Sequence, residues 1–482
     1  MLAQPDRAVN RAWRECRPHL WIKIFASFFK KKCLFFFGKK NQKTFVHLAA
    51  CLFLWHPGYD DGVHISRSFA MSASDAVSEA RQWARLMALA EIGGIAEGLG
   101  VNRPCLSVGD RQARRLMIGW AEAIGCSVSV DAAANLFFRR EGAEPDLAPV
   151  LTGSHMDSQP EGGRFDGIWG VVAGLEALCA LHDAGLVTRR AVELVAWTNE
   201  EGGRFRPGCT GSMPWAGHTA LEVFADVRDP DGIRYGDALA EQLALEADIP
   251  RRPLGGRPHA YVEAHIEQGP ILEAEGVDIG VVSGIQGSRW FTVTLSGATA
   301  HAGTAPLRGR RDAVQDMVRA VVALNALTAD PSDTLRFTVA RVEVSPNTSN
   351  SVANRVRFTI DLRHPEAAVL QAKGDAIAGV IRGAVAGCDV AIEENFHAMP
   401  VVFDPLVTGA VAAAAAAEGL RQRALPSGAF HDAQFVVPVC PTGMIFVPSR
   451  GGISHNPAEY SSPAQLAAGA RVLVRTLLAL AG

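Results

Sequence analysis

Short apolar runs that lead directly into dense polar clusters are the feature that most constrains the fold of this chain. Residues 149–152 lead into a cluster around His155, and residues 192–197 lead into one around Glu200. Apolar runs of this length are typical of buried strands. In an open α/β sheet, ligands bind in the crevice at the carboxyl ends of the strands. The pattern therefore predicts an α/β sheet with a functional site along one edge.

The wider pattern predicts two domains, one of them inserted in the other. Short apolar runs alternate with helical spacing in residues 132–283, and this rhythm resumes after Pro400. The segment between them has the order β-α-β-β-α-β, which is typical of a small ferredoxin-like unit. We therefore expect a large α/β domain at residues 71–285 and 399–482, interrupted by a smaller α+β domain at residues 286–398.

The individual elements follow from the same periodicity, with helical spacing for helices and alternation or short apolar runs for strands. In the large domain the expected helices are 76–95, 170–184, 411–422 and 463–480, and the expected strands are 149–152, 192–197, 261–265 and 444–447. In the small domain the expected strands are 289–296, 335–344, 356–363 and 389–393, and the expected helices are 312–329 and 365–387.

Residues 1–70 differ in composition from the rest of the chain. They are rich in aromatic and basic residues and hold only four acids. One interpretation is a targeting segment, because transit peptides are basic and poor in acids. The interpretation that we favour is an upstream extension that is not part of the working protein, with Met71 as the natural start.

Composition excludes several classes of protein. The chain has 47 Lys+Arg against 50 Asp+Glu, so no basic excess is available to bind nucleic acid. No apolar run reaches the roughly 18 to 20 residues of a membrane-spanning helix, and we expect no membrane partner. The nine cysteines are scattered and form no C-x-x-C pair. This distribution argues against a disulfide framework and favours a reducing, cytoplasmic compartment.

Each polar cluster has two interpretations when it is taken alone. His155 and Asp157 are two residues apart, so the imidazole can bind a metal while the carboxylate orients the ring. The alternative is a turn-rich loop whose polar side chains cap the next helix. Glu200 and Glu201 are adjacent carboxylates, and a pocket can hold both only with a cation or a proton. The alternative for this pair is a solvated acidic turn.

The clusters are stronger evidence together than apart. Three imidazoles and two carboxylates fall at or just beyond the strand ends of one predicted domain. This set suits two borderline divalent ions such as zinc, with one carboxylate bridging them. The five candidate ligands are His155, Asp166, Glu201, His265 and His455.

The small domain holds a separate polar cluster. It contains His301 in the segment GATAHAG, followed by Asn350 and Arg363. An arginine is suited to fork-like recognition of a carboxylate. For the other arginines of this region, namely Arg310, Arg311 and Arg357, surface charge at strand ends is the better interpretation.

Missing motifs narrow the chemistry further. The sequence has no G-x-S-x-G elbow, no Walker A loop, no G-x-G-x-x-G fingerprint and no H-E-x-x-H pair. A serine hydrolase, a P-loop NTPase, a Rossmann-type dehydrogenase and a gluzincin are therefore disfavoured.

Together these clusters resemble the M20-type metallohydrolase superfamily. Within it they resemble the amidase branch of N-carbamoyl-L-amino-acid hydrolases, allantoate amidohydrolases and β-ureidopropionases. The resemblance runs from Met71 to the C-terminus, and His265 is the branch marker because peptidase and deacylase relatives use a carboxylate there. The matching segments are GSHMDSQPEGGRFDG, TNEEGGRF, EAHIEQGP, GATAHAGTAPLRGRRDA, PNTSNSVANRVRFTIDLR and SHNPAEY.

The resemblance implies a role for each metal-site residue. Asp166 would bridge two divalent metal ions. His155 and His265 would complete one site, and Glu201 and His455 would complete the other. Zinc is the expected metal, although manganese, cobalt and nickel suit the same ligands. The residues that would act beside the metals are Glu200, as the general base, and Asp157, which would orient His155.

The resemblance also implies the substrate contacts and a lid and dimerisation role for the small domain. Gln268, Asn350 and Arg363 match positions that hold the substrate carboxylate. His301 matches a histidine that enters the partner subunit's active site, which requires a homodimer. His431 matches a substrate-side histidine, and the residue before it is Phe430 where the family usually has glycine.

We therefore expect a metal-dependent amidohydrolase that cleaves the ureido C–N bond of an N-carbamoyl-L-amino acid, allantoate or ureidopropionate. The alternative is a dinuclear aminopeptidase or N-acyl-amino-acid deacylase of the same superfamily. A catalytically silent scaffold is disfavoured, because all five ligands and Glu200 are present.

Overall fold

The computed structural model describes residues 73–95 and 99–482 as a mixed α/β protein with a nine-stranded and a four-stranded sheet. The fold class expected from the sequence is confirmed. The interpretation of residues 1–70 as an extension concerns residues outside the described part of the chain. We call the nine-stranded sheet with its helices the large module, and residues 287–398, which form the four-stranded sheet, the small module.

The centre of the large sheet consists of four adjacent parallel strands. Their order is β15 (Thr442–Val447), β7 (Ala260–Ile266), β5 (Val150–His155) and β6 (Val192–Trp197). Every residue of these four strands is buried, as expected for a sheet covered on both faces. The other five strands of the large sheet are β3 (Ser127–Val130), β4 (Leu136–Arg140), β8 (Ile279–Ile285), β13 (Val401–Val402) and β14 (Gln422–Ser427). A separate two-stranded ribbon pairs β1 (Gly94–Ile95) with β2 (Gly100–Val101).

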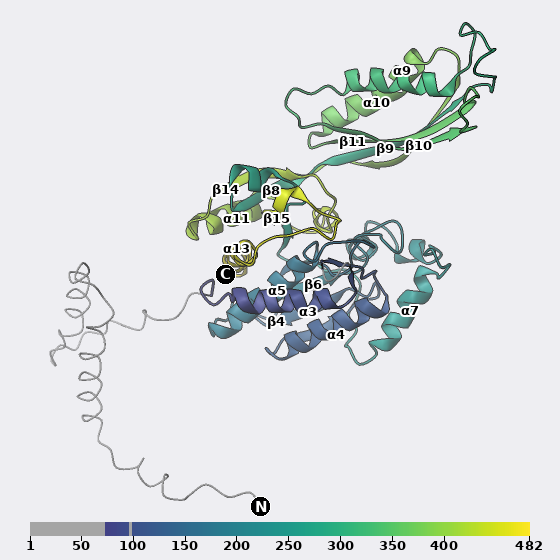
Figure 1. Cartoon of the computed structure of the whole chain (residues 1–482). Coiled ribbons are helices and arrows are strands. Elements are labelled where there is room, and N and C mark those ends of the chain that lie inside the picture. The colour runs from purple at the N-terminus through teal and green to yellow at the C-terminus, as the bar shows by residue number, and fades with distance from the viewer. Residues whose placement is uncertain (1–72, 96–98) are drawn as a thin grey trace, which may run out of the picture. The chain divides into compact units, whose positions relative to one another are not determined.

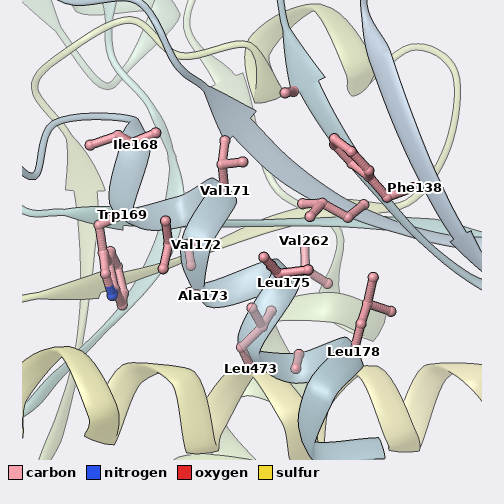
Figure 2. Packing of buried hydrophobic residues seen from close by; sticks show 14 of the residues in the cluster. Phe138, Ile168, Trp169, Val171, Val172, Ala173, Leu175, Leu178, Val262 and Leu473 are labelled. Carbon is pink, nitrogen blue, oxygen red and sulfur yellow. The ribbon is translucent and has the colours of Figure 1, made fainter. Parts of the chain in front are cut away.

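Helix α5 (Ile168–Asp183) forms the core of the large module. It is apolar on almost every side, and it packs against β5, β7 and α13 (Pro463–Ala481). Figure 2 shows Trp169, Val172 and Leu175 of this helix among the buried side chains around Val262 and Leu473. The remaining helices of the module are α3 (Glu79–Glu91), α4 (Val108–Glu122), α6 (Ser212–Trp215), η4 (Leu221–Phe224), α7 (Tyr235–Leu245), α8 (Ile271–Glu275), α11 (Pro405–Ala417), α12 (Ala433–Val436) and η5 (Arg450–Gly452).

Glycine lets α5 approach the sheet closely enough to position the site. A Cβ on Gly170 would lie 2.1 Å from the carbonyl oxygen of Ala264 in β7. A Cβ on Gly167, which has φ of 63°, would lie 2.2 Å from the His155 ring. The start of α5 is therefore pressed against the strand ends, and this contact places the preceding Asp166 beside them.

The small module has the expected order of elements: β9 (Gly287–Ser296), α9 (Ala313–Leu327), β10 (Arg336–Ser345), β11 (Arg355–His364), α10 (Ala367–Ala384) and β12 (Asp389–Ala398). Its antiparallel sheet has the order β10-β11-β9-β12. Figure 1 shows α9 and α10 together over one face of this sheet. A separate buried cluster, which includes Val293, Phe358 and Ile377, lies beneath them.

Two expected helices of the large module are wrong in their bounds. The helix expected at residues 76–95 spans only Glu79–Glu91, and Gly94 and Ile95 form β1. Residues 411–422 were expected to be helical, but α11 runs from Pro405 to Ala417, and Gln422 begins β14. Asp404 caps α11 through its side chain, and Pro405 occupies the first turn, where its missing N–H costs nothing. The helix ends before Gly419, which has φ of 70°.

Among the described residues, one helix has the length and mean hydropathy of a membrane span. This helix is α13, and 67% of its most apolar window is buried inside the large module. Arg471 and Arg475 interrupt its apolar sequence, and both contact Glu418. Its composition is therefore explained by its place in the core.

Candidate metal centre

The four parallel strands deliver the candidate ligands to one edge of the sheet. His155 is the last residue of β5, and His265 is the sixth of seven residues in β7. Glu200 and Glu201 follow β6, and His455 follows β15 after a short loop. Because the carboxyl ends of parallel strands meet at the same edge, residues from four distant segments converge there.

Asp166 lies at the centre of the site. Its Oδ1 is 3.2 Å from His265 Nε2 and 4.0 Å from His155 Nε2. Its Oδ2 is 3.2 Å from His455 Nε2, which in turn is 3.4 Å from Glu201 Oε2. The two oxygens of one carboxylate therefore face two different sets of ligands, and each set with Asp166 has the spacing of a metal site.

Glu200 lies beside the first of these sets. Its Oε2 is 3.5 Å from His155 Nε2, and its side chain is 9% exposed. Burial is the largest influence on this carboxyl, and Asp432 and Glu201 add negative charge nearby. Together they raise the pKa of Glu200 well above its ordinary value.

Four further ionisable groups of the site also have shifted pKa values. Burial and the neighbouring Asp166 raise the pKa of Glu201 to about 8. Burial lowers the pKa of His265, but the contact with Asp166 outweighs it and raises this pKa to about 9. The Asp166 contact also raises the pKa of His455 to about 9. Burial opposes ionisation of Asp166, but the two imidazoles hold its pKa well below the ordinary value.

The donor set fits divalent ions of the zinc type. Imidazole nitrogens with carboxylate oxygens suit borderline ions, and a hard ion such as Ca²⁺ would instead select oxygen donors alone. The side chains of Asp166 and Glu201 are only 5% and 4% exposed, and their ion-pair partners in the described part of the chain are histidines. A bound cation would supply the missing positive charge.

Three residues of the site have backbone conformations that are uncommon for side-chain-bearing residues. Asn199, Gln268 and His455 have φ values of 56°, 56° and 51°. Such left-handed residues cost free energy and are found mainly where the surroundings require them, as at functional sites. Asn199 directly precedes Glu200, so this turn determines where both glutamates point.

Asp157 contacts His155 differently from the sequence expectation. His155 Nδ1 is 3.0 Å from the backbone carbonyl oxygen of Asp157, which is placed to accept a hydrogen bond from it. The carboxylate oxygen Oδ1 of Asp157 is 3.7 Å from the same nitrogen. The carboxylate instead accepts hydrogen bonds from the amides of Glu200 and Glu201. Burial and the nearby Asp110 raise its pKa to about 7. The side chain therefore holds the turn that carries the two glutamates.

Gln268 and His431 lie close to the candidate metal ligands. Gln268 Nε2 donates to Asp166 Oδ2 at 2.9 Å and to Ser454 Oγ at 3.1 Å. The ring of His431 is 4.5 Å from the ring of His265, and its Nε2 is 2.8 Å from Ser427 Oγ. Both predicted substrate residues are therefore within the site.

The three predicted residues of the small module lie in two places. Arg363 is near the end of β11, where its Nη1 donates to the carbonyl of Gly428 in the large module. His301 and Asn350 are exposed in adjacent loops that join through the His301–Ser351 bridge and the bond from Ala302 N to Asn350 O. These loops lie at the opposite end of β11, where Arg355 pairs with Ser296.

This separation limits how two of the predicted contacts can be made. Asn350 and Arg363 of the same chain cannot hold one carboxylate, because β11 lies between them. From Arg355 to Arg363 a strand extends roughly 26 Å, because it rises about 3.3 Å per residue. Motif spacing did not reveal the separation, since it does not say which end of a strand a loop occupies.

The sequence analysis assigned no role to Glu459. This residue joins the loop that carries Asp166 to the loop that carries His455. Glu459 is 1% exposed, and its Oε1 accepts the amides of Phe165 and Asp166 at 3.0 and 3.1 Å. Its Oε2 is 2.9 Å from Ser454 Oγ, whose single proton can be donated to this oxygen or to Asp166 Oδ2 at 3.2 Å. The only sequence signal was its presence in the same segment as His455, SHNPAEY.

The fold and the site define a metal-dependent hydrolase: parallel strands end in imidazoles and carboxylates around one central aspartate, with a further buried carboxylate beside them. Residues 151–479 match the peptidase family M20/M25/M40, and the chain belongs to this family.

Two curated relatives cover most of the chain. The N-carbamoyl-L-amino-acid amidohydrolase of Rhizobium meliloti is 40% identical over 406 residues, which are 83% of this chain and 96% of the relative. The allantoate amidohydrolase of Bacillus subtilis (strain 168) is 32% identical over 421 residues, which are 85% of this chain and 98% of the relative.

A solved structure gives the same result. The crystal structure of an amidase of the hydantoinase/carbamoylase family from Burkholderia multivorans matches with a TM-score of 0.78 at 43% identity. The match covers 84% of this chain and 98% of the other chain. The relatives are thus amidohydrolases that act on carbon–nitrogen bonds, and the expected branch of the superfamily is confirmed.

Proposed function

We propose that this enzyme hydrolyses the ureido C–N bond of an N-carbamoyl-L-amino acid or a similar ureido acid, with release of ammonia. The observation that carries the proposal is the central Asp166, whose two oxygens face two ligand sets beside the buried Glu200. Relatives that act on carbamoyl amino acids and on allantoate support the ureido chemistry.

In this proposal the site holds two divalent ions, most simply Zn²⁺, with Mn²⁺, Co²⁺ or Ni²⁺ as alternatives. His155, Asp166 and His265 would hold one ion, and Asp166, Glu201 and His455 the other. When bound, the ions would supply Lewis-acid polarisation of the ureido carbonyl and lower the pKa of the attacking water.

Glu200 acts as general base and then as general acid. Its carboxylate takes a proton from the attacking water and returns it to the leaving nitrogen. Its position supports this role, because Glu200 Oε2 lies 3.5 Å from Nε2 of the candidate ligand His155. Asp157 supports these steps by accepting the Glu200 amide.

Arg363 receives the substrate carboxylate. Asp361 fixes the guanidinium through Nε and Nη2, and Gly428 O accepts one N–H of Nη1. One N–H remains on each terminal nitrogen, and this pair can hold a carboxylate in the bidentate geometry that arginine favours. Gln268 and His431 contact the substrate between Arg363 and the metal ligands.

His301 and Asn350 act on the active site of a partner subunit. A ureido carbon is a poor electrophile because two nitrogens donate into it, so a hydrogen-bond donor to the developing oxyanion is needed. His301 and Asn350 lie at the end of β11 opposite Arg363, too far along the strand to contact a substrate held by Arg363 of their own chain. We therefore infer a homodimer in which the small module is both lid and dimerisation surface.

We place the enzyme in the cytoplasm. All six cysteines in the described part of the chain are free thiols, and five of them are buried. A reducing compartment keeps thiols in this state.

The experiment that tests the function is ammonia release by the full-length chain loaded with Zn²⁺ or Mn²⁺. The panel holds N-carbamoyl amino acids of both hands, allantoate and ureidopropionate, beside N-acetyl amino acids and dipeptides assayed for free amine. We expect turnover of at least one ureido acid, abolished by a chelator. Cleavage of only the acyl or peptide substrates would move the enzyme to the deacylase or peptidase branch.

A further inference from the structure

The loop Gly428–His431 connects the two ends of the proposed substrate site. At one end, Gly428 O accepts a hydrogen bond of 3.0 Å from Arg363 Nη1. At the other end, the ring of His431 is 4.5 Å from the ring of the ligand His265. A substrate whose carboxylate meets Arg363 and whose ureido carbon meets the metal ligands therefore has its α-carbon beside this loop.

Phe430 is the large side chain of the loop, and its ring is held in place by neighbours. The guanidinium carbon of Arg363 is 5.6 Å from the ring centroid. Phe396 of β12 packs edge-on against the same ring, with centroids 5.5 Å apart and planes at 84°. Phe396 is backed in turn by its strand partner Trp290, at 4.7 Å. Aromatic pairs of this geometry are favourable, so the ring has a fixed orientation.

Phe430 is half-buried, and its ring lies beside Arg363, the proposed carboxylate-binding arginine. Two features here suit recognition of an amino acid derivative. Arg363 can bind its carboxylate, and the rigid apolar ring of Phe430, next to His431 in the sequence, can contact its side chain. A polar substituent against this surface would lose hydrogen bonds to water and gain none.

We propose that Phe430 is a specificity-determining residue, which forms an apolar wall for the substituent on the substrate's α-carbon. The enzyme would then prefer N-carbamoyl amino acids with large apolar side chains over allantoate, whose α-carbon carries a second polar ureido group. This inference rests on the proposed function and narrows its substrate class.

The test compares substrates that differ only in the side chain. The selectivity ratio is kcat/KM for N-carbamoyl-L-phenylalanine divided by kcat/KM for N-carbamoylglycine, measured on the full-length, metal-loaded enzyme. An apolar contact in a pocket contributes about tenfold or more to discrimination. We expect Phe430→Ala to lower the ratio about tenfold and Phe430→Leu, which keeps an apolar side chain, to lower it less.

The matched control is Phe435→Ala. Phe435 is also half-buried and lies in the next helix, where its ring contacts His218. We expect this variant to leave the ratio within about twofold of the wild type. Melting temperature and bound metal, measured for every variant, identify a variant that fails to fold; Phe430→Leu then carries the test.

Two results would overturn the inference while leaving the proposed function intact. In the first, Phe430→Ala lowers kcat/KM equally for both substrates, which would make Phe430 a packing residue between the modules. In the second, the ratio rises in Phe430→Ala, which would mean that the ring blocks large side chains. Absence of turnover of every ureido acid by the wild type would instead contradict the proposed function and this inference with it.

Discussion

Asp316 of the small module and the two site glutamates of the large module are buried acids with opposite surroundings. In the small module Asp316 accepts hydrogen bonds from the amides of Ala386, Gly387 and Cys388 and from Arg319. Burial opposes its ionisation, but these donors outweigh burial and hold the pKa of Asp316 well below the ordinary value. In the large module Glu200 and Glu201 are buried among other acids, and their pKa values are raised.

The surroundings of a buried acid separate one whose charge the fold already satisfies from one that needs a further partner. Asp316 has as many donors as it can use, so it stabilises the fold and needs nothing further. The acids around Asp166 face imidazoles and one another, an arrangement that is stable only with protons or cations. The following predictions test this contrast, from the largest expected effect to the smallest.

Replacing Glu200 removes the proposed proton acceptor without removing a candidate metal ligand. We expect Glu200→Gln to lower kcat about 10³-fold, because general-base catalysis contributes about 10²- to 10⁴-fold. Metal content and KM should change little. Steady-state ammonia release and metal analysis check this, with Glu161→Gln, an exposed acid nearby, as the control. Normal turnover in Glu200→Gln would remove it from the role of base.

Replacing Asp316 breaks a saturated structural site. We expect Asp316→Asn to lower the free energy of unfolding of the small module by about 3 kcal/mol, since hydrogen bonds to a buried charge are lost or weakened. Asp333→Asn, an acid that is 93% exposed, should change stability by less than about 0.5 kcal/mol. Hydrogen exchange of the small-module amides in urea measures both, and equal effects in the two variants would contradict the contrast.

The Asp316 effect also has a defined pH dependence. Because the pKa is lowered on folding, the stabilisation is fully present above the unfolded pKa of about 3.9 and is lost as pH falls further. The difference between wild type and Asp316→Asn should therefore be large at pH 7 and shrink towards pH 2. A difference that grows in acid would show that the pKa of Asp316 is raised.

Replacing Glu459 loosens the two ligand loops that it joins. We expect Glu459→Ala to weaken Zn²⁺ binding about 10- to 100-fold, the usual cost of losing a partner of metal ligands. Glu459→Gln keeps an acceptor for the amides of Phe165 and Asp166 and should recover part of the affinity. Calorimetric titration of the metal-free chain measures the affinity directly. Unchanged affinity in Glu459→Ala would make this residue a packing element only.

Replacing Arg363 affects substrate binding more than chemistry. We expect Arg363→Ala to raise KM for carboxylate substrates about tenfold, with a smaller change in kcat. Arg357→Ala is the control, because Arg357 is a surface arginine of the same strand whose nearest acid, Glu343, is 3.9 Å away. An unchanged KM in Arg363→Ala would exclude this residue from carboxylate binding.

Much of the fold and of the ligand set could be predicted because their signals are local. β6 has the predicted bounds, and β7 and β15 differ from prediction by no more than two residues at either end, since short apolar runs bounded by polar clusters define them. The position of each cluster just after a strand is enough to predict that the clusters converge. The start of α11 also has a local signal, because an Asp–Pro pair such as Asp404–Pro405 is typical of the beginning of a helix.

Other features depend on contacts between distant residues and could not be read from local patterns. Glu459 acts on amides almost 300 positions away, and the Asp157 carboxylate acts on a turn more than 40 positions away. The separation of Asn350 from Arg363 follows from the length and direction of β11, which no motif records. Likewise, the packing of Phe430 on Phe396 required the fold.

The central claim is that the acids of the large module form a two-metal site around Asp166. Anomalous X-ray diffraction at the zinc absorption edge, from crystals of the Zn²⁺-loaded full-length enzyme, tests it most directly. We predict two anomalous peaks per subunit, one beside His155, Asp166 and His265 and one beside Asp166, Glu201 and His455. A single peak, or peaks that do not share Asp166, would contradict the account.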